Sequence, residues 1–237
     1  MLSNTVLKQI ILITDGHSNK GGCPILAARK ARGMGIVTNG IGVLDAGQLG
    51  ERGRAEIKKI VSAGGGICRF VLAEEIMYTI HTMSVQVARK EIELSINQQL
   101  SKVGGTNLSN LPLKIRNRII SYMTRMEDEM ELHIGLLIDT SGSMLAKRSL
   151  LEKGLGDLIN TFSLRSGIIK LTIVQFPGRS ENPSIIKSQQ TDNSVTFDVL
   201  RNMEYGGLTP TGPAIDMAVK ALNIVCKNKN CQLVNTP

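Results

Sequence analysis

The sequence predicts an α/β protein whose core is a mostly parallel β-sheet flanked by helices. Several apolar runs rich in Ile, Val and Leu show no alternation with polar residues, which is typical of strands buried on both faces. These runs alternate with segments of helical periodicity, and glycine or proline marks most of the boundaries. Strands that alternate with helices indicate parallel strands joined by right-handed crossovers.

The first third of the chain has the pattern β-α-β-α-β. Pro24 opens the first predicted helix, where its missing N–H costs no hydrogen bond. Three consecutive glycines close the second predicted helix. The predicted strands span residues 6–14, 36–43 and 67–72, and the predicted helices span residues 24–32 and 51–63.

Residues 74–130 predict two long helices that form a hairpin. The first, over residues 74–100, would be ~40 Å long at the rise of an α-helix, so we expect its far end to project or to meet another element. Glycine and proline interrupt the pattern before a second helix over residues 113–130. We expect this second helix to cover the first with one apolar face, formed by Ile115, Ile119, Met123, Met126 and Met130.

The last part of the chain resumes the alternation. A loop at residues 206–213, rich in glycine and proline, presents the hydroxyls of Thr209 and Thr211. The polar tail, residues 228–237, is expected to be loose. Strands are predicted at residues 132–138, 168–176 and 185–189, and helices at residues 144–164 and 214–225.

Composition argues against several classes of protein. The formal charge of +8 is spread along the chain without a polybasic run, which disfavours a dedicated nucleic-acid-binding protein. No run approaches the ~20 apolar residues of a membrane span, so we expect no membrane partner and a cytoplasmic location. No common catalytic motif is present, and we expect the protein not to be an enzyme. The four cysteines lack C-x-x-C spacing and predict free thiols: Cys23, Cys68, Cys226 and Cys231.

A metal site is predicted where the strand at residues 132–138 ends. Asp139, Ser141 and Ser143 stand at alternate positions, a spacing that aims their oxygens at one point. Mg²⁺ accepts such a mixture of carboxylate, hydroxyl and water ligands. Gly142 is expected to allow a sharp bend between the two serines. The alternative interpretation is an ordinary strand end with Ser143 as the N-cap of the next helix.

Three segments resemble the metal-ion-dependent adhesion site of von Willebrand factor A (VWA) domains. Residues 139–143 resemble its first motif, and residues 207–212 resemble its threonine-bearing loop. Residues 11–16 resemble the strand that ends in its aspartate, here Asp15. With the flanking elements the resemblance covers about residues 6–100 and 132–225, and the same pattern resembles the YabS-like group of bacterial VWA proteins.

The order of these motifs differs from that of the family, because the aspartate strand opens this chain. The resemblance implies a doubly wound, six-stranded sheet ordered 3-2-1-4-5-6. Residues 1–100 would supply strands four to six and end in a long helix, residues 101–131 would complete the hairpin, and residues 132–237 would supply strands one to three. Either these parts form one circularly permuted domain, or they exchange between two chains in a dimer.

The resemblance also implies ligands and a function. Ser141 and Ser143 would bind Mg²⁺ or Mn²⁺ through their hydroxyls. Thr209 would bind the cation directly or through a water molecule. Asp139 and Asp15 would bind the cation or its waters. Thr211, Gly142 and Gly207 would lie behind these ligands. An open coordination position would accept a carboxylate from a protein partner, which predicts a cation-dependent protein-binding module. A metal-assisted phosphoester hydrolase and a basic nucleic-acid-binding scaffold are the alternatives.

Overall fold

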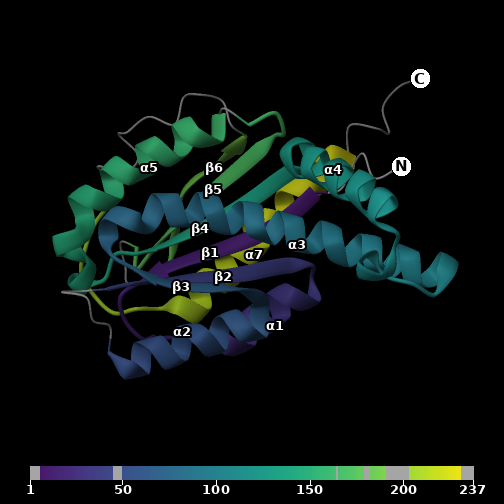
Figure 1. Ribbon diagram of the computed structural model, residues 1–237. Helices are drawn as coiled ribbons and strands as arrows, with labels where there is room; N and C mark the ends of the chain where they lie inside the picture. Colours follow the sequence, from purple (N-terminus) through teal and green to yellow (C-terminus); the bar gives the residue numbers. More distant parts are fainter. Residues whose placement is uncertain (1–5, 45–49, 164, 179–181, 191–202, 231–237) are drawn as a thin grey trace, which may run out of the picture.

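One six-stranded sheet forms the centre of the computed structural model, which describes residues 6–44, 50–163, 165–178, 182–190 and 203–230 (Figure 1). The strands lie in the order β3-β2-β1-β4-β5-β6, and all pairs are parallel except β5 with β6. The predicted doubly wound, mostly parallel sheet is confirmed. The strands are β1 (Val6–Thr14), β2 (Ile36–Val43), β3 (Gly65–Val71), β4 (Glu131–Asp139), β5 (Ile169–Phe176) and β6 (Ser184–Gln190).

Helices cover both faces of the sheet (Figure 1). One face is covered by α1 (Pro24–Gly33), α2 (Glu51–Gly64) and α7 (Thr211–Asn230). The other is covered by α3 (Ile76–Gly104) and α5 (Arg148–Ser163), with α4 (Leu113–Glu129) packed on α3. Short 3-10 turns are η1 (Ala73–Glu75), η2 (Leu108–Asn110) and η3 (Gly142–Lys147).

The unalternating apolar sequence of β1 follows from this double cover. Ile10 and Leu12 pack toward α1 and α7, whereas Ile11 and Ile13 pack into the cluster under α3 and α5. All four side chains are fully buried. A strand at the centre of a sheet covered on both faces has no side that can carry exposed polar residues.

The predicted hairpin is present, but part of its predicted apolar face is exposed. Deep burial along α3 ends at Ile92, and the following part of the hairpin extends past the sheet (Figure 1). Leu94 is 43% exposed and Ile115 is 49% exposed. The expectation that Ile115 packs inward on the first helix is therefore wrong; the buried residue of α4 is Met123, nearer the sheet.

Several predicted boundaries also differ from the structure. The helix expected from residue 144 begins as the turn η3 before it continues as α5. The strand expected at residue 67 already begins at Gly65, whose left-handed backbone ends α2. Helix α7 begins at Thr211 and reaches Asn230, so the first residues of the predicted loose tail are helical. The rest of that tail, residues 231–237, lies outside the described residues.

Cys23 and Cys68 are free thiols, as predicted. The side chains of Cys226 and Cys231 lie outside what the structure describes. Within the described part of the chain, no helix combines the length and the apolarity needed to cross a bilayer.

Candidate metal centre

The two predicted aspartates lie at the ends of neighbouring strands. β1 and β4 are parallel, with Ile13 opposite Ile138, so Asp15 and Asp139 emerge at the same edge of the sheet. Asp139 is fully buried, and the Asp15 side chain is 4% exposed. The carboxyl edge of a doubly wound sheet is where such folds bind ligands.

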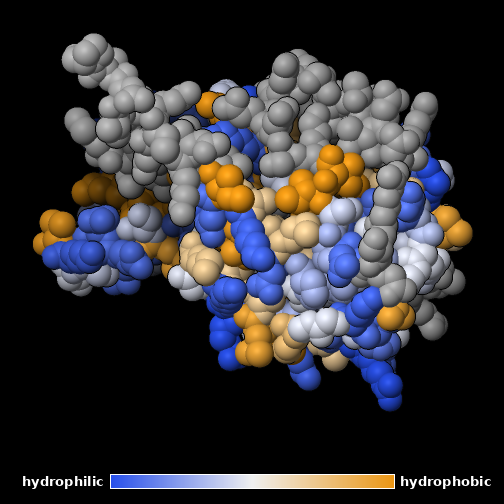
Figure 2. Space-filling view, turned by 180° about the vertical axis from the view of Figure 1, so that it is seen from behind, coloured by the Kyte–Doolittle hydropathy of each residue, from blue (hydrophilic) through white to orange (hydrophobic). Residues whose placement is uncertain are grey.

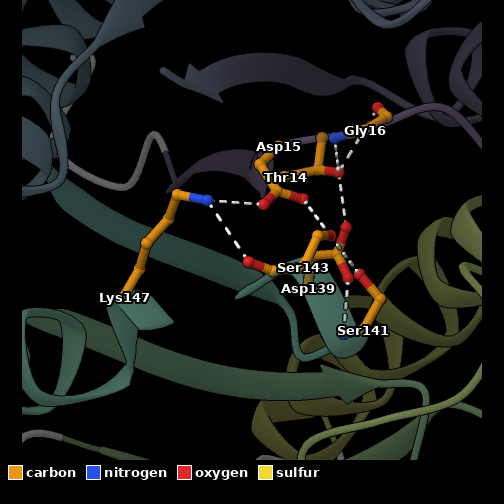
Figure 3. A network of polar contacts seen from close by, with 7 residues as sticks. All are labelled: Thr14, Asp15, Gly16, Asp139, Ser141, Ser143 and Lys147. Atoms are coloured by element: carbon orange, nitrogen blue, oxygen red, sulfur yellow. Dashed lines mark hydrogen bonds and ion pairs between the residues drawn. The ribbon is translucent and has the colours of Figure 1, made fainter. Parts of the chain in front are cut away.

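Hydroxyl groups connect the two strand ends (Figure 3). Ser143 Oγ donates a hydrogen bond to Asp15 Oδ1 at 2.7 Å, and Ser141 Oγ lies 3.3 Å from Ser143 Oγ. The alternate-position serines therefore do point to one place, and Asp15 joins them from a position 128 residues away. Ser143 is exposed, so this group of oxygens opens to the surface.

Asp139 is held by donors on both of its oxygens. Thr14 Oγ1 donates to Asp139 Oδ2 at 2.5 Å, and the Ser141 backbone N–H donates to Asp139 Oδ1 at 2.9 Å. Thr14 Oγ1 in turn accepts a hydrogen bond from the Gly16 backbone N–H. Because both of its oxygens already accept hydrogen bonds, Asp139 mainly fixes the backbone turn that carries Ser141.

Burial raises the pKa of Asp139 to about 6. The hydrogen bonds from Thr14 and Ser141 oppose this change, whereas the neighbouring charge of Asp15 adds to it. A divalent cation beside the carboxylate would favour its charged form and lower this pKa again. Asp139 therefore carries an electrostatic cost in the metal-free protein that a bound cation would offset.

Lys147 brings a positive charge to the same site. Its Nζ lies 2.7 Å from Asp15 Oδ2 and 3.3 Å from the Ser143 carbonyl oxygen. The Lys147 side chain is only 8% exposed, so this ion pair is shielded from water. Lys147 was not among the residues predicted from the sequence; the available signal was a lysine four residues after Ser143, close to the predicted ligands.

The threonine loop is anchored to both strand ends through its backbone. The Gly206 N–H donates to the Thr140 carbonyl oxygen at 2.8 Å. The Thr209 N–H donates to Asn19 Oδ1 at 2.7 Å, and the Thr209 carbonyl oxygen accepts from Ser18 Oγ. The backbone of Thr209 is thus held against the loop after β1, and its part in binding a cation stays a prediction. Thr211, buried, begins α7 next to this loop.

The glycines named from the sequence differ in backbone conformation. Gly207 has a φ of +78°, a conformation that favours glycine, and its place behind the ligands stays a prediction. Gly142 has no left-handed φ and has open space where a Cβ would stand, so the expected glycine-dependent bend at this position is wrong. A Cβ on Gly212 would overlap the Gly22 carbonyl oxygen, which makes Gly212 the position where α7 approaches the loop before α1.

The donor atoms fit a hard divalent cation. Ser141 Oγ, Ser143 Oγ and Asp15 Oδ1 are oxygens, which suit Mg²⁺ or Mn²⁺. Within the described ranges, no three His, Cys, Asp or Glu side chains gather in a way that could hold a metal ion. Any cation held by the described part of this site would therefore depend on hydroxyl and water ligands.

Known proteins resemble this chain over nearly its whole length. The uncharacterized protein YabS of Bacillus subtilis (strain 168) is 29% identical over 216 residues, which covers 90% of this chain and 88% of YabS. A structure of proximal thread matrix protein 1 from the mussel byssus, with zinc in its metal-ion-dependent adhesion motif, is 14% identical to this chain. The alignment covers 88% of this chain and 44% of the mussel chain. Its TM-score of 0.30 is too low to support an inference.

A solved structure gives a firmer relationship. No protein-family model matches the sequence. The crystal structure of an uncharacterized protein from Alicyclobacillus acidocaldarius subsp. acidocaldarius DSM 446 aligns with a TM-score of 0.88 and 35% identity. The alignment covers 94% of this chain and 97% of the Alicyclobacillus chain. This chain therefore belongs to the same protein family as the Alicyclobacillus protein.

Proposed function

We propose that the protein is a divalent-cation-dependent protein-binding module of the VWA type that recognises an acidic residue of its partner. The observation that carries this proposal is the contact of Ser143 with Asp15 across two adjacent strands, with Ser141 alongside. Three oxygens from two separate parts of the sequence meet at an exposed edge of the sheet.

Each residue has a distinct part in this proposal. Ser141, Ser143 and Asp15 would hold Mg²⁺ or Mn²⁺, and Thr209 would support it directly or through water. Asp139 would fix the turn through its bonds to Thr14 and the Ser141 N–H. The cation would supply an electrophilic centre for a partner's carboxylate. Because Asp15 alone would contribute a directly bound carboxylate, the site would keep a positive charge that attracts this anion.

One closed chain is the simplest assembly for this site. Asp15 comes from the first half of the sequence and Ser143 from the second, and both halves form one sheet in a single chain. This arrangement supports a permuted monomer over an exchanged dimer. The order of the motifs along the chain would then be a circular permutation of the VWA order.

A calorimetric titration tests metal binding. Wild-type protein is expected to take up one Mg²⁺ or Mn²⁺, and Asp15→Ala and Ser143→Ala are each expected to weaken uptake at least about tenfold. Asp157→Ala removes an exposed carboxylate elsewhere and serves as the matched control, with no expected change. Folded wild-type protein that takes up neither cation would refute the proposal.

Carboxylate recognition needs a second measurement. Electron paramagnetic resonance of the Mn²⁺-loaded protein can detect replacement of a bound water by a carboxylate. Acetate is expected to change the spectrum, whereas acetamide, of similar shape but without charge, is not. Equal responses to both compounds would argue against anion recognition while leaving metal binding intact.

A further inference from the structure

The far end of the helical hairpin concentrates positive charge. The sequence between Ser95 and Met126 contains no Asp or Glu, and the acidic residues resume at Glu127. Most of the basic side chains in this segment are exposed. The basic residues of the segment are Lys102, Lys114, Arg116, Arg118 and Arg125.

Apolar and basic side chains share one outward stripe on α4. Ile115, Arg118, Tyr122 and Arg125 follow one another at intervals of three or four residues, so they lie on the same side of the helix. All four are exposed. The inner side of the helix faces α3 through Met123, which is 4% exposed.

The end of the hairpin adds two further exposed apolar side chains. Val103, in the last turn of α3, is 88% exposed, and Leu113, in the first turn of α4, is 63% exposed. Tyr122 and Arg125 lie closer to the base of the hairpin, where Glu127 follows. The name hairpin tip is used below for the exposed and half-exposed side chains at its far end: Lys102, Val103, Leu113, Lys114, Ile115, Arg116 and Arg118.

The hairpin tip projects away from the candidate metal centre. α3 starts beside the carboxyl ends of the strands and runs back past their other ends, so the tip lies beyond the opposite edge of the sheet (Figure 1). Seen from behind, the tip forms a projection that carries both strongly hydrophilic and hydrophobic residues (Figure 2).

We propose that the hairpin tip binds the surface of an anionic lipid bilayer. A convex end can reach a flat layer, where basic side chains contact lipid phosphates and the aliphatic side chains enter the interface. The tip would hold the protein on the bilayer while the metal centre faces away from it.

This inference revises the sequence-based expectation of no membrane partner. That expectation rested on the absence of an apolar run long enough to span a membrane, which does not bear on binding at a bilayer surface. The fold instead brings Lys102 near the start of α4 and leaves the acidic residues from Glu127 onward at the base of the hairpin. The inference does not depend on the proposed metal site.

Vesicle sedimentation of the full chain tests the proposal, in buffer with EDTA so that no divalent cation can bridge protein and lipid. Wild-type protein is expected to bind phosphatidylglycerol-containing vesicles at low salt and not pure phosphatidylcholine vesicles. The double variant Lys114→Glu/Arg118→Glu is expected to bind at least about 20-fold more weakly, since each basic residue near an anionic surface contributes about fivefold. The double variant Leu113→Ser/Ile115→Ser is expected to bind several-fold more weakly with its charge unchanged.

A second charge reversal separates a specific surface from overall charge. Arg52→Glu/Lys59→Glu makes the same change of charge at exposed positions of α2 and is expected to retain most of the binding. Unchanged thermal unfolding would show that each variant is folded. Three results would overturn the proposal: no binding of wild type to anionic vesicles, equal losses in the two charge-reversal variants, or a tip-mediated dimer that excludes lipid.

Discussion

Lys147 and Asp15 form a buried ion pair at the candidate metal centre, with Nζ 2.7 Å from Oδ2. The ammonium group neutralises the one carboxylate that also contacts Ser143. A cation bound beside Ser143 would therefore compete electrostatically with Lys147 for Asp15. Two positive charges near one carboxylate set the balance between the metal-free and metal-bound forms.

Lys147→Met is expected to separate stability from metal affinity. Removing one partner of a buried pair leaves the Asp15 carboxylate uncompensated, which should destabilise the metal-free protein by about 3 kcal/mol. Mg²⁺ affinity should rise, because the competing ammonium is gone. Thermal unfolding with EDTA and with Mg²⁺ measures both effects.

Arg148→Met is the matched control for that variant. Arg148 is the next residue and forms a more exposed pair with Glu152 at 2.6 Å. Its replacement should leave the Mg²⁺-dependent shift in melting temperature unchanged. If Lys147→Met binds Mg²⁺ more weakly than wild type, Lys147 supports the site instead of competing with the cation.

Asp139→Asn should stabilise the metal-free protein and weaken metal binding. Because burial raises the folded-state pKa of Asp139 from 3.8 to about 6, the charged form is disfavoured in the fold. Stability is then lost as the pH rises through about 6, and the uncharged variant avoids a cost on the order of 1–3 kcal/mol at pH 8. Mg²⁺ affinity should fall about 10- to 100-fold, since Asp139 holds the turn that carries Ser141.

Urea unfolding in EDTA at pH 5 and pH 8, followed by calorimetry with Mg²⁺, checks both halves of this expectation. The stabilisation should be about half as large at pH 5 as at pH 8, because the unfolded chain already ionises above about pH 3.8 whereas the folded protein ionises near pH 6. If the Asp139→Asn variant binds Mg²⁺ as tightly as wild type does, this carboxylate has no part in the metal site.

His133 should make stability fall in acid. It is 1% exposed, its Nε2 lies 2.8 Å from Glu131 Oε1, and Lys170 Nζ lies 2.9 Å from the same oxygen. Burial lowers the pKa of His133 below 6.5; the hydrogen bond to Glu131 opposes this, and the charges of Lys170 and Lys8 add to it. The folded protein therefore binds fewer protons at this ring than the unfolded chain, so stability declines as the pH falls below about 6.5.

The variant His133→Gln isolates that contribution. Glutamine can still donate a hydrogen bond to Glu131 but does not titrate. As the pH falls from 7.5 to 5.5, the unfolding free energy of wild type should therefore decrease relative to that of the variant. A difference that stays constant over this range would contradict the assignment.

Gly212→Ala should disturb the threonine loop, whereas Gly142→Ala should not. A methyl group on Gly212 would overlap the Gly22 carbonyl oxygen, and relief of such overpacking typically costs about 1–3 kcal/mol. Gly142 has open space at the same place. Chemical unfolding and Mg²⁺ titration of both variants measure the contrast, and equal stability of the two would mean that α7 adjusts without cost.

The sheet was predictable because its local signals agree with its tertiary environment. The run from Ile10 to Ile13 is apolar without alternation, and the structure buries it on both faces. The resemblance to VWA domains implied that the strands before Asp15 and Asp139 are neighbours, and adjacent parallel strands end at one edge of the sheet. Neither inference required knowledge of side-chain packing.

The hairpin and the ion pair were less predictable because they depend on where neighbouring elements stop. The periodicity that places Ile115 inward continues past the end of the sheet, and no pattern in the sequence marks that end. Lys147 contacts Asp15 from η3, a 3-10 turn where an α-helix was expected. Contacts between Thr209 and Asn19 link two loops with no shared motif.

The position of a bound cation would decide whether Ser141, Ser143 and Asp15 form a metal site. Crystals of the Mn²⁺-loaded protein, measured at a wavelength where manganese scatters anomalously, would show the metal position without reference to any motif. We expect one strong anomalous peak within bonding distance of Ser141 Oγ and Ser143 Oγ, with Asp15 beside it. Well-ordered crystals with no peak at this edge of the sheet, or with the Mn²⁺ bound elsewhere, would contradict this expectation.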